Sequence, residues 1–175
     1  MSSLRDCIYR SPIMAARLKR YHGWPVLHQQ TVGEHSARVA NIYVEVFGLP
    51  RAGVLYYCLN HDAGELLAGD VPFGGKDHVK TLRAAINEAE KIGLRLLGIK
   101  LPVLTESEQA KVKISDLLEM HEFGMIEEHM GNALAAPITD ATLVAALEKA
   151  DEIEERSAVE LWLKKQELHR YVANE

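Results

Sequence analysis

Apolar residues recur along most of this chain at the three- and four-residue spacing of helix faces. One face of a predicted helix over residues 31–47 is formed by His35, Val39, Ile42 and Val46. A shorter apolar helix is predicted over residues 52–60. No segment shows the strict alternation of a half-buried strand, so the pattern predicts an all-α helical bundle.

Local sequence signals predict where several helices begin and end. Ser11 followed by Pro12 is typical of a helix start, and this helix is expected to run to about Arg20. Thr31 and Glu34 have the spacing of a capping box at the start of the next helix. Residues 48–50, Gly-Leu-Pro, are expected to end that helix.

The second half of the chain predicts three longer helices. The first spans about 77–98, after a turn-rich loop over residues 70–75. A second begins at a capping box formed by Thr105 and Glu108 and is broken over residues 131–137. The last starts near 140 and ends near 172, with a bend allowed. We find no linker, so residues 1–175 are predicted to form a single domain.

Composition narrows the function classes. With 175 residues and 47% hydrophobic content the chain is long and apolar enough for a core, and its net charge of -5 disfavours binding to nucleic-acid polymers. Its two cysteines suggest no disulfide framework. No apolar run approaches a membrane span of ~20 residues. We expect a soluble cytoplasmic protein without a membrane partner.

Two histidines and two acids form a candidate metal site. His61 and Asp62 are adjacent in the segment LNHDAGELLAGD, His35 lies upstream in TVGEHSARV, and Asp116 lies downstream in KVKISDLLEM. Two imidazoles and two carboxylates suit a divalent transition metal such as zinc, manganese, cobalt or iron. Such a metal lowers the pKa of its water towards ~7, which predicts a hydrolase.

Each residue has an ordinary explanation when taken alone. His35 is consistent with a hydrogen-bonded core histidine, and Asp116 with a solvated acid or a partner of Lys113. Together, however, two imidazoles and two carboxylates are costly to bury unless a cation or a network compensates them. The combination therefore favours a metal site between helices.

Further charged residues are placed to act at this site. Glu65 follows Asp62 by three residues, so both share a helical face and Glu65 is suited to proton transfer. Lys113 shares a face with the candidate ligand three residues later, and Arg20 and Lys76 flank loops that lead towards the site. These cations suit phosphate binding. The alternatives are a surface glutamate and solvated cations.

These segments resemble the HD-domain phosphohydrolases, and above all the compact branch that holds bacterial 5'-deoxynucleotidases and phage dATP triphosphohydrolases. The resemblance rests on the blocks EHSARVA, NHDAGELLAGDVP and KVKISDLLE and runs from about Pro12 to about Glu122. It implies an HD-domain helical bundle. The metal ligands that it implies are His35, His61, Asp62 and Asp116.

The resemblance also implies roles for residues around the metal. Glu65 and Asp70 match catalytic acids, the latter also contacting the sugar, and Arg20, Lys76 and Lys113 match phosphate-binding positions. Tyr21 stands where the family has a tryptophan that packs on sugar and base, and Trp24 follows three residues later. Which aromatic residue stacks therefore stays open.

The function that the resemblance favours is a dNTP triphosphohydrolase of the dATP type, which releases deoxynucleoside and triphosphate. A 5'-deoxynucleotidase acting on dNMPs is the close alternative. Hydrolysis of (p)ppGpp or of a cyclic dinucleotide is a further one, although no GYP segment follows the His-Asp block. A non-catalytic nucleotide sensor is the alternative from another class.

The resemblance bears on assembly and setting as well. It implies a homo-oligomer, either a dimer or a hexamer, in a bacterial or phage-infected cell. Candidate interface residues are Val159, Leu161, Trp162 and Leu168.

Overall fold

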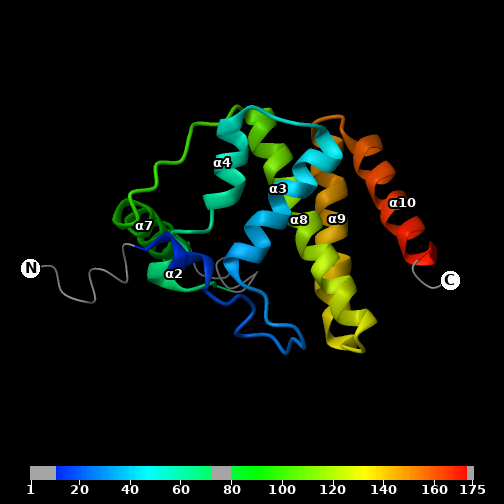
Figure 1. Ribbon diagram of the computed structural model, residues 1–175, viewed down its shortest axis with the longest axis horizontal. Helices are drawn as coiled ribbons and strands as arrows, with labels where there is room; N and C mark the ends of the chain where they lie inside the picture. The colour runs from blue at the N-terminus through cyan, green and yellow to red at the C-terminus, as the bar shows by residue number, and fades with distance from the viewer. Residues whose placement is uncertain (1–10, 72–79, 173–175) are drawn as a thin grey trace, which may run out of the picture. The chain divides into compact units, whose positions relative to one another are not determined.

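The computed structural model describes residues 11–71 and 80–172 (Figure 1). Every regular element among them is a helix, apart from an isolated antiparallel bridge between Lys19 and Thr31. The prediction of an all-α fold is therefore confirmed. None of the described helices is long and apolar enough to cross a membrane.

The described residues divide into two compact units. Unit 1 contains the described residues within 1–38 and 56–102, and unit 2 contains those within 39–55 and 103–175. Two of the three boundaries between the units fall inside helices α3 and α4, and the third falls in the segment between α7 and α8. The single domain over residues 1–175 stays a prediction.

Helices α3 and α4 have the bounds that the sequence predicts, to within one residue. Helix α3 is Val32–Phe47 and helix α4 is Ala52–Asn60. The first capping box is present, because the amide of Thr31 donates to Glu34 Oε2 at 2.7 Å and the amide of Glu34 donates to Thr31 Oγ1 at 3.2 Å. These reciprocal bonds satisfy amides that the start of a helix leaves without partners.

Unit 1 is built from short helices, turns and one longer helix. Besides parts of α3 and α4, it contains α2 (Pro12–Ala16), α5 (Glu65–Ala68) and α7 (Lys80–Leu96). Its small core is formed by Ala15, Ala63 and Leu97, with Leu66, Leu94 and Ile99 packed against it.

Helix α2 is shorter than the sequence predicts. It ends before Arg17 rather than near Arg20. After it, Lys19 pairs with Thr31 and the amide of Arg20 donates to the carbonyl of Gln30 at 2.9 Å. These contacts with a later segment replace the hydrogen bonds of a continued helix. Local sequence signals do not reveal such contacts.

Unit 2 is built from long helices around an aliphatic core. It contains α8 (Glu106–His129), the 3₁₀ helix η1 (Ala133–Ala135), α9 (Ala136–Glu152) and α10 (Arg156–Val172). The predicted capping box of Thr105 and Glu108 begins α8, and α8 lies against α9 (Figure 1). The core residues are Ile42, Ile114, Leu117, Leu118, Ala146, Ala150, Val159 and Trp162.

The predicted last helix is wrong in two respects. It begins at Ala136 rather than near 140, and it is two helices, because Glu154 adopts a left-handed φ of 60° between α9 and α10. Two of the four candidate interface residues belong to the core of unit 2. Val159 and Trp162 are 0% and 3% exposed, and the Trp162 indole donates to Glu45 Oε2 at 2.7 Å.

Candidate metal centre

His35 lies on α3, one turn after the capping box that begins the helix. Its side chain is 0% exposed, as the periodic pattern of the sequence predicts. An imidazole removed from water must have partners for its polar nitrogens, because an unpaired buried polar group costs free energy. This histidine therefore belongs to a polar cluster inside unit 1.

His61 follows α4 directly and has a fixed ring orientation. Its Nδ1 lies 2.8 Å from the carbonyl oxygen of Cys58. Since a carbonyl only accepts, we infer that Nδ1 carries the proton and that Nε2 keeps its lone pair. The ring of Tyr57 stacks on the imidazole at 6.2 Å between centroids and 11° between planes. Both contacts orient Nε2 as a donor to a metal ion.

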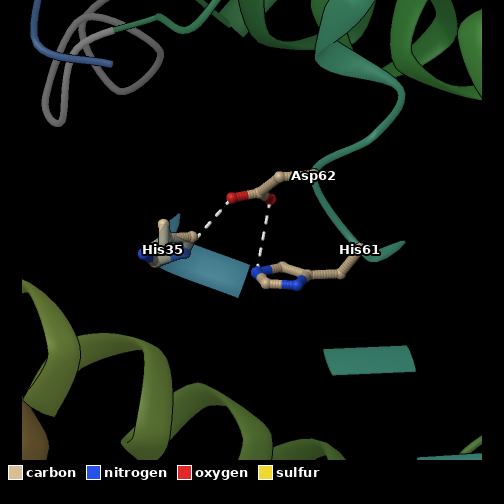
Figure 2. A group of neighbouring side chains, drawn as sticks. All are labelled: His35, His61 and Asp62. Carbon is tan, nitrogen blue, oxygen red and sulfur yellow. Dashed lines mark ion pairs between the residues drawn. The ribbon is translucent and has the colours of Figure 1, made fainter. Parts of the chain in front are cut away.

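The carboxylate of Asp62 lies between the two imidazoles (Figure 2). Asp62 Oδ2 is 3.3 Å from His35 Nε2, and Asp62 Oδ1 is 3.4 Å from His61 Nε2. The ligand atoms that the three side chains offer all lie within 4.8 Å of one another. Residues separated by 26 positions in the sequence thus converge on one point.

The charge state of Asp62 suits a cation. Burial of the carboxyl raises its pKa, but its electrostatic interaction with the imidazole of His61, the hydrogen bond and electrostatic interaction with His35, and the charge of Arg20 outweigh burial. The pKa of Asp62 is therefore held well below its usual range. The carboxylate is ionised at neutral pH and carries the negative charge of the cluster.

These three side chains fit a divalent transition metal. The Nε2 atom of His61 is buried and makes no hydrogen bond to any described residue, and it lies 3.4 Å from Asp62 Oδ1. Two imidazoles and one carboxylate are a donor set typical of catalytic zinc sites, where three protein ligands leave a position open. Among the described residues, His35, His61 and Asp62 are the group suited to hold a metal ion.

Glu65 begins α5, one tight turn after Asp62. Its amide donates to the carbonyl of Asp62 at 3.0 Å, and its side chain is only 7% exposed. This burial is inconsistent with the surface glutamate that the sequence leaves open as an alternative. A buried carboxylate on the turn that carries a metal ligand is well placed for proton transfer.

Arg20, Tyr21 and Asp70 form a second polar group in unit 1. Tyr21 has a left-handed φ of 59°, a strained conformation for an aromatic residue, and its amide donates to Asp70 Oδ2 at 2.8 Å. The guanidinium of Arg20 lies 5.2 Å from the centre of the Tyr21 ring. Strain of this kind is retained where the surrounding structure holds it, which is common at functional sites.

Comparison with known proteins gives a structural match. No protein-family model matches the chain, and no curated protein matches it in sequence. A solved structure does match, that of the cyanophage S-2L HD phosphohydrolase DatZ bound to dA and one catalytic Zn²⁺ ion. The match covers 95% of this chain and 96% of that one, with a TM-score of 0.72 and 15% sequence identity.

The chain has the HD phosphohydrolase fold. The fold expected from the resemblance of three short sequence blocks is therefore confirmed over nearly the whole chain. Residues beyond Glu122, for which the sequence indicates only helix content, are included in the match.

The other site residues expected of an HD fold lie elsewhere in the chain. Lys113 and Asp116 belong to unit 2, on α8, where Lys113 Nζ lies 2.6 Å from Asp116 Oδ2. This pairing is one of the alternatives that the sequence leaves open for Asp116. Lys76 lies outside the described residues. The roles of these three residues stay predictions.

Several residues that support the site are absent from the predicted set. Cys58 and Tyr57 orient His61 from three and four residues upstream, a spacing that places them on the same helical face. That spacing is a signal the sequence offers. Gln29 holds Arg20 by a hydrogen bond from its side-chain amide to the Arg20 carbonyl. This contact depends on a loop conformation that the sequence does not specify.

Proposed function

We propose that this protein is a metal-dependent phosphohydrolase of 2'-deoxynucleotides. The observation that carries the proposal is the convergence of His35, His61 and Asp62 in a chain with the HD phosphohydrolase fold. The similar DatZ structure contains dA and a catalytic Zn²⁺ ion, which supports a deoxynucleotide substrate and a divalent metal for this chain as well.

Within this proposal, His35, His61 and Asp62 hold the metal, and Asp116 is assigned as a fourth ligand from the sequence. A bound divalent metal supplies Lewis-acid activation of water and of phosphoryl oxygens. Glu65 accepts a proton from the water that attacks the α-phosphorus. As the bond from phosphorus to the 5'-oxygen breaks, that oxygen takes up a proton and leaves as the deoxynucleoside.

The positive side chains have a separate role in the proposal. Arg20 stabilises the negative charge that develops on the phosphoryl oxygens, and Lys76 and Lys113 are assigned the same role from the sequence. Tyr21 is assigned to the sugar and base, and Asp70 to the sugar and to proton transfer. The bond from the Tyr21 amide to Asp70 supports a shared role for these two residues.

For the phosphate chain we propose a deoxynucleoside triphosphate, dATP in the first place, as the substrate. Attack at the α-phosphorus then yields deoxyadenosine and intact triphosphate. A 5'-deoxynucleotidase would perform the same bond cleavage on dAMP and would release phosphate. The bound deoxynucleoside in DatZ supports both readings for this chain, since it is the nucleoside product of either reaction.

Product analysis tests the proposal. The metal-free protein is supplied with Mn²⁺, Co²⁺ or Zn²⁺ and incubated with dATP, dGTP, dAMP or ATP, with Asp62→Ala as the control. Deoxyadenosine and triphosphate from dATP, absent with the control variant, are the expected result.

Three other outcomes would change the assignment. Turnover of dAMP alone would make the protein a 5'-deoxynucleotidase. Equal turnover of ATP and dATP would remove the 2'-deoxy specificity. Tight nucleotide binding without turnover under any of the metals would contradict hydrolysis and favour a sensor.

A further inference from the structure

The turn that carries His61 and Asp62 packs against helix α7 through backbone atoms, with no side chain between them. This turn, residues 61–64, links α4 to α5, and its last residue is Gly64. Helices α5 and α7 pack against each other within unit 1. The contact lies two residues from Asp62 and next to Glu65, so it adjoins the candidate metal centre in sequence and in space.

The turn and the helix each have a glycine, Gly64 and Gly93, at the point where their backbones come closest. A Cβ atom added to Gly64 would lie 2.3 Å from the carbonyl oxygen of Glu90 on α7. A Cβ atom added to Gly93, one helical turn further along α7, would lie 2.3 Å from the carbonyl oxygen of Gly64. Both obstacles are backbone atoms, which cannot rotate away as the end of a side chain can.

Backbone conformation does not explain why either position is glycine. Gly64 has φ -64° and ψ -22°, in the right-handed helical region open to every residue. Gly93 lies in the interior of α7 and is not among the glycines with positive φ. Glycine is a poor helix former. Its presence at Gly93 is therefore explained by the close approach of the turn.

A side chain at Gly93 would have to move the turn. The shift from 2.3 Å to an ordinary contact of 3.4 Å is roughly 1 Å. Metal ligands must lie within about 0.2 Å of their preferred distances, so such a displacement of Asp62 relative to His35 would disturb a site built from both. Misplacement by about 1 Å is also enough to slow catalysis substantially.

A related contact exists on the side of His35. A Cβ atom added to Gly33 would lie 2.9 Å from the carbonyl oxygen and 3.0 Å from the Cβ atom of Ala16 on α2. Gly33 is two residues before His35 on α3. The start of α3, which carries His35, and the turn that carries His61 and Asp62 thus each pack against a neighbouring helix through a glycine.

We propose that Gly93 is a positioning residue for the metal-binding turn. Because Gly93 has no side chain, the carbonyl of Gly64 can pack directly against α7. Gly93 contributes no ligand and is 31 residues from Asp62 in the sequence. The inference rests on the proposed function to the extent that it requires a metal at His35, His61 and Asp62.

The test compares Gly93→Ala with Ala85→Gly by titrating the metal-free proteins with Co²⁺. Ala85 is an exposed residue of α7. Its replacement by glycine weakens the helix without adding an atom, so it reproduces a loss of stability without displacing the turn. Circular dichroism verifies that each variant is folded, and the visible absorption of bound Co²⁺ reports the geometry of its ligands.

We expect Gly93→Ala to bind Co²⁺ about 10–100-fold more weakly than the wild type, with an altered absorption spectrum. Ala85→Gly should unfold at a lower temperature and yet bind Co²⁺ with the affinity and spectrum of the wild type. Wild-type affinity and spectrum in Gly93→Ala would overturn the proposal. A higher unfolding temperature in that variant, typical of an unhindered glycine-to-alanine change in a helix, would overturn it too.

If Gly93→Ala is unfolded in buffer, the titration is repeated at low temperature with trimethylamine N-oxide, which favours the compact state. Weaker Co²⁺ binding by the refolded variant would support the proposal. A variant that remains unfolded there would show that Gly93 serves folding alone and would contradict it. Failure of the wild type to bind Co²⁺ would refute the metal centre itself. Equal binding by all three proteins would instead leave the metal centre in place and refute only the role of Gly93.

Discussion

In unit 1 the chain turns often and backbone groups hold the polar side chains, whereas unit 2 buries aliphatic side chains between long helices. His61 is oriented by the carbonyl of Cys58, Tyr21 is held through its amide, and the His61–Gly64 turn rests on the backbone of α7. Unit 2 instead contains a core of eight buried residues. This difference separates two tasks: contacts in unit 1 fix the geometry of His35, His61 and Asp62, and burial in unit 2 contributes stability.

The largest effect should follow from removing the proton acceptor in unit 1. Glu65→Gln keeps the size of the side chain but cannot take a proton, so we expect kcat to fall by about 10²–10⁴-fold. Steady-state kinetics on dATP measure this, and Zn²⁺ affinity measured by calorimetry is the control. Unchanged kcat would remove Glu65 from the catalytic group.

The next effect concerns the core of unit 2. Trp162 is 3% exposed, and Trp162→Ala should lower the free energy of unfolding by about 3–5 kcal/mol because it leaves a cavity. Urea denaturation measures the loss. Under conditions where the variant is folded, its Zn²⁺ affinity should equal that of the wild type. A large loss of affinity in the folded variant would contradict the separation of tasks between the units.

A smaller effect is expected at the strained Tyr21. Asp70→Ala removes the acceptor of the Tyr21 amide and should lower the free energy of unfolding by about 1 kcal/mol. Asp70→Asn keeps an acceptor oxygen and should retain most of that stability, while losing the proposed role in proton transfer. Urea denaturation and kinetics of both variants separate the two roles. Equal destabilisation by Asn and Ala would show that the charge, rather than the hydrogen bond, holds Tyr21.

The smallest effect is a pH dependence at the surface of unit 2. The hydrogen bonds from Arg51, then the backbone bond from Thr105, lower the pKa of Glu108 from 4.5 to about 2. A lowered pKa in the folded state means that the contribution to stability is present above pH 4.5 and is lost as pH falls towards about 2. The difference in unfolding free energy between wild type and Arg51→Met should shrink over this range. A difference that is constant from pH 6 to pH 2 would contradict the assignment.

Elements set by nearby residues were predictable from the sequence. Both capping boxes and the bounds of α3 and α4 depend on contacts within a few residues, and His35 is buried as the periodicity of its helix predicts. The pairing of His61 with Asp62 was visible because the two are adjacent. The convergence of both with His35 was predicted from residue types that suit a metal together, and the resemblance to a known family implies the same ligands.

Features that depend on distant segments were not predictable in this way. Helix α2 ends early because Lys19 and Arg20 bond to a later segment, and α9 ends where Glu154 takes a left-handed conformation without a glycine to signal it. The contact of Gly64 with Gly93 joins positions 29 residues apart, and neither glycine is required by its own backbone. Sequence patterns indicate the faces and ends of helices, but they do not indicate which distant segments come into backbone contact.

The central claim is that His35, His61 and Asp62 bind one divalent metal ion, and calorimetric titration of the metal-free protein with Zn²⁺ tests it most directly. We predict one tightly bound ion per chain in the wild type. His61→Ala and Asp62→Ala should each weaken binding by more than the about 10–100-fold that loss of an outer-shell partner causes. Absence of binding in the wild type, or equal affinity in all three proteins, would contradict the account.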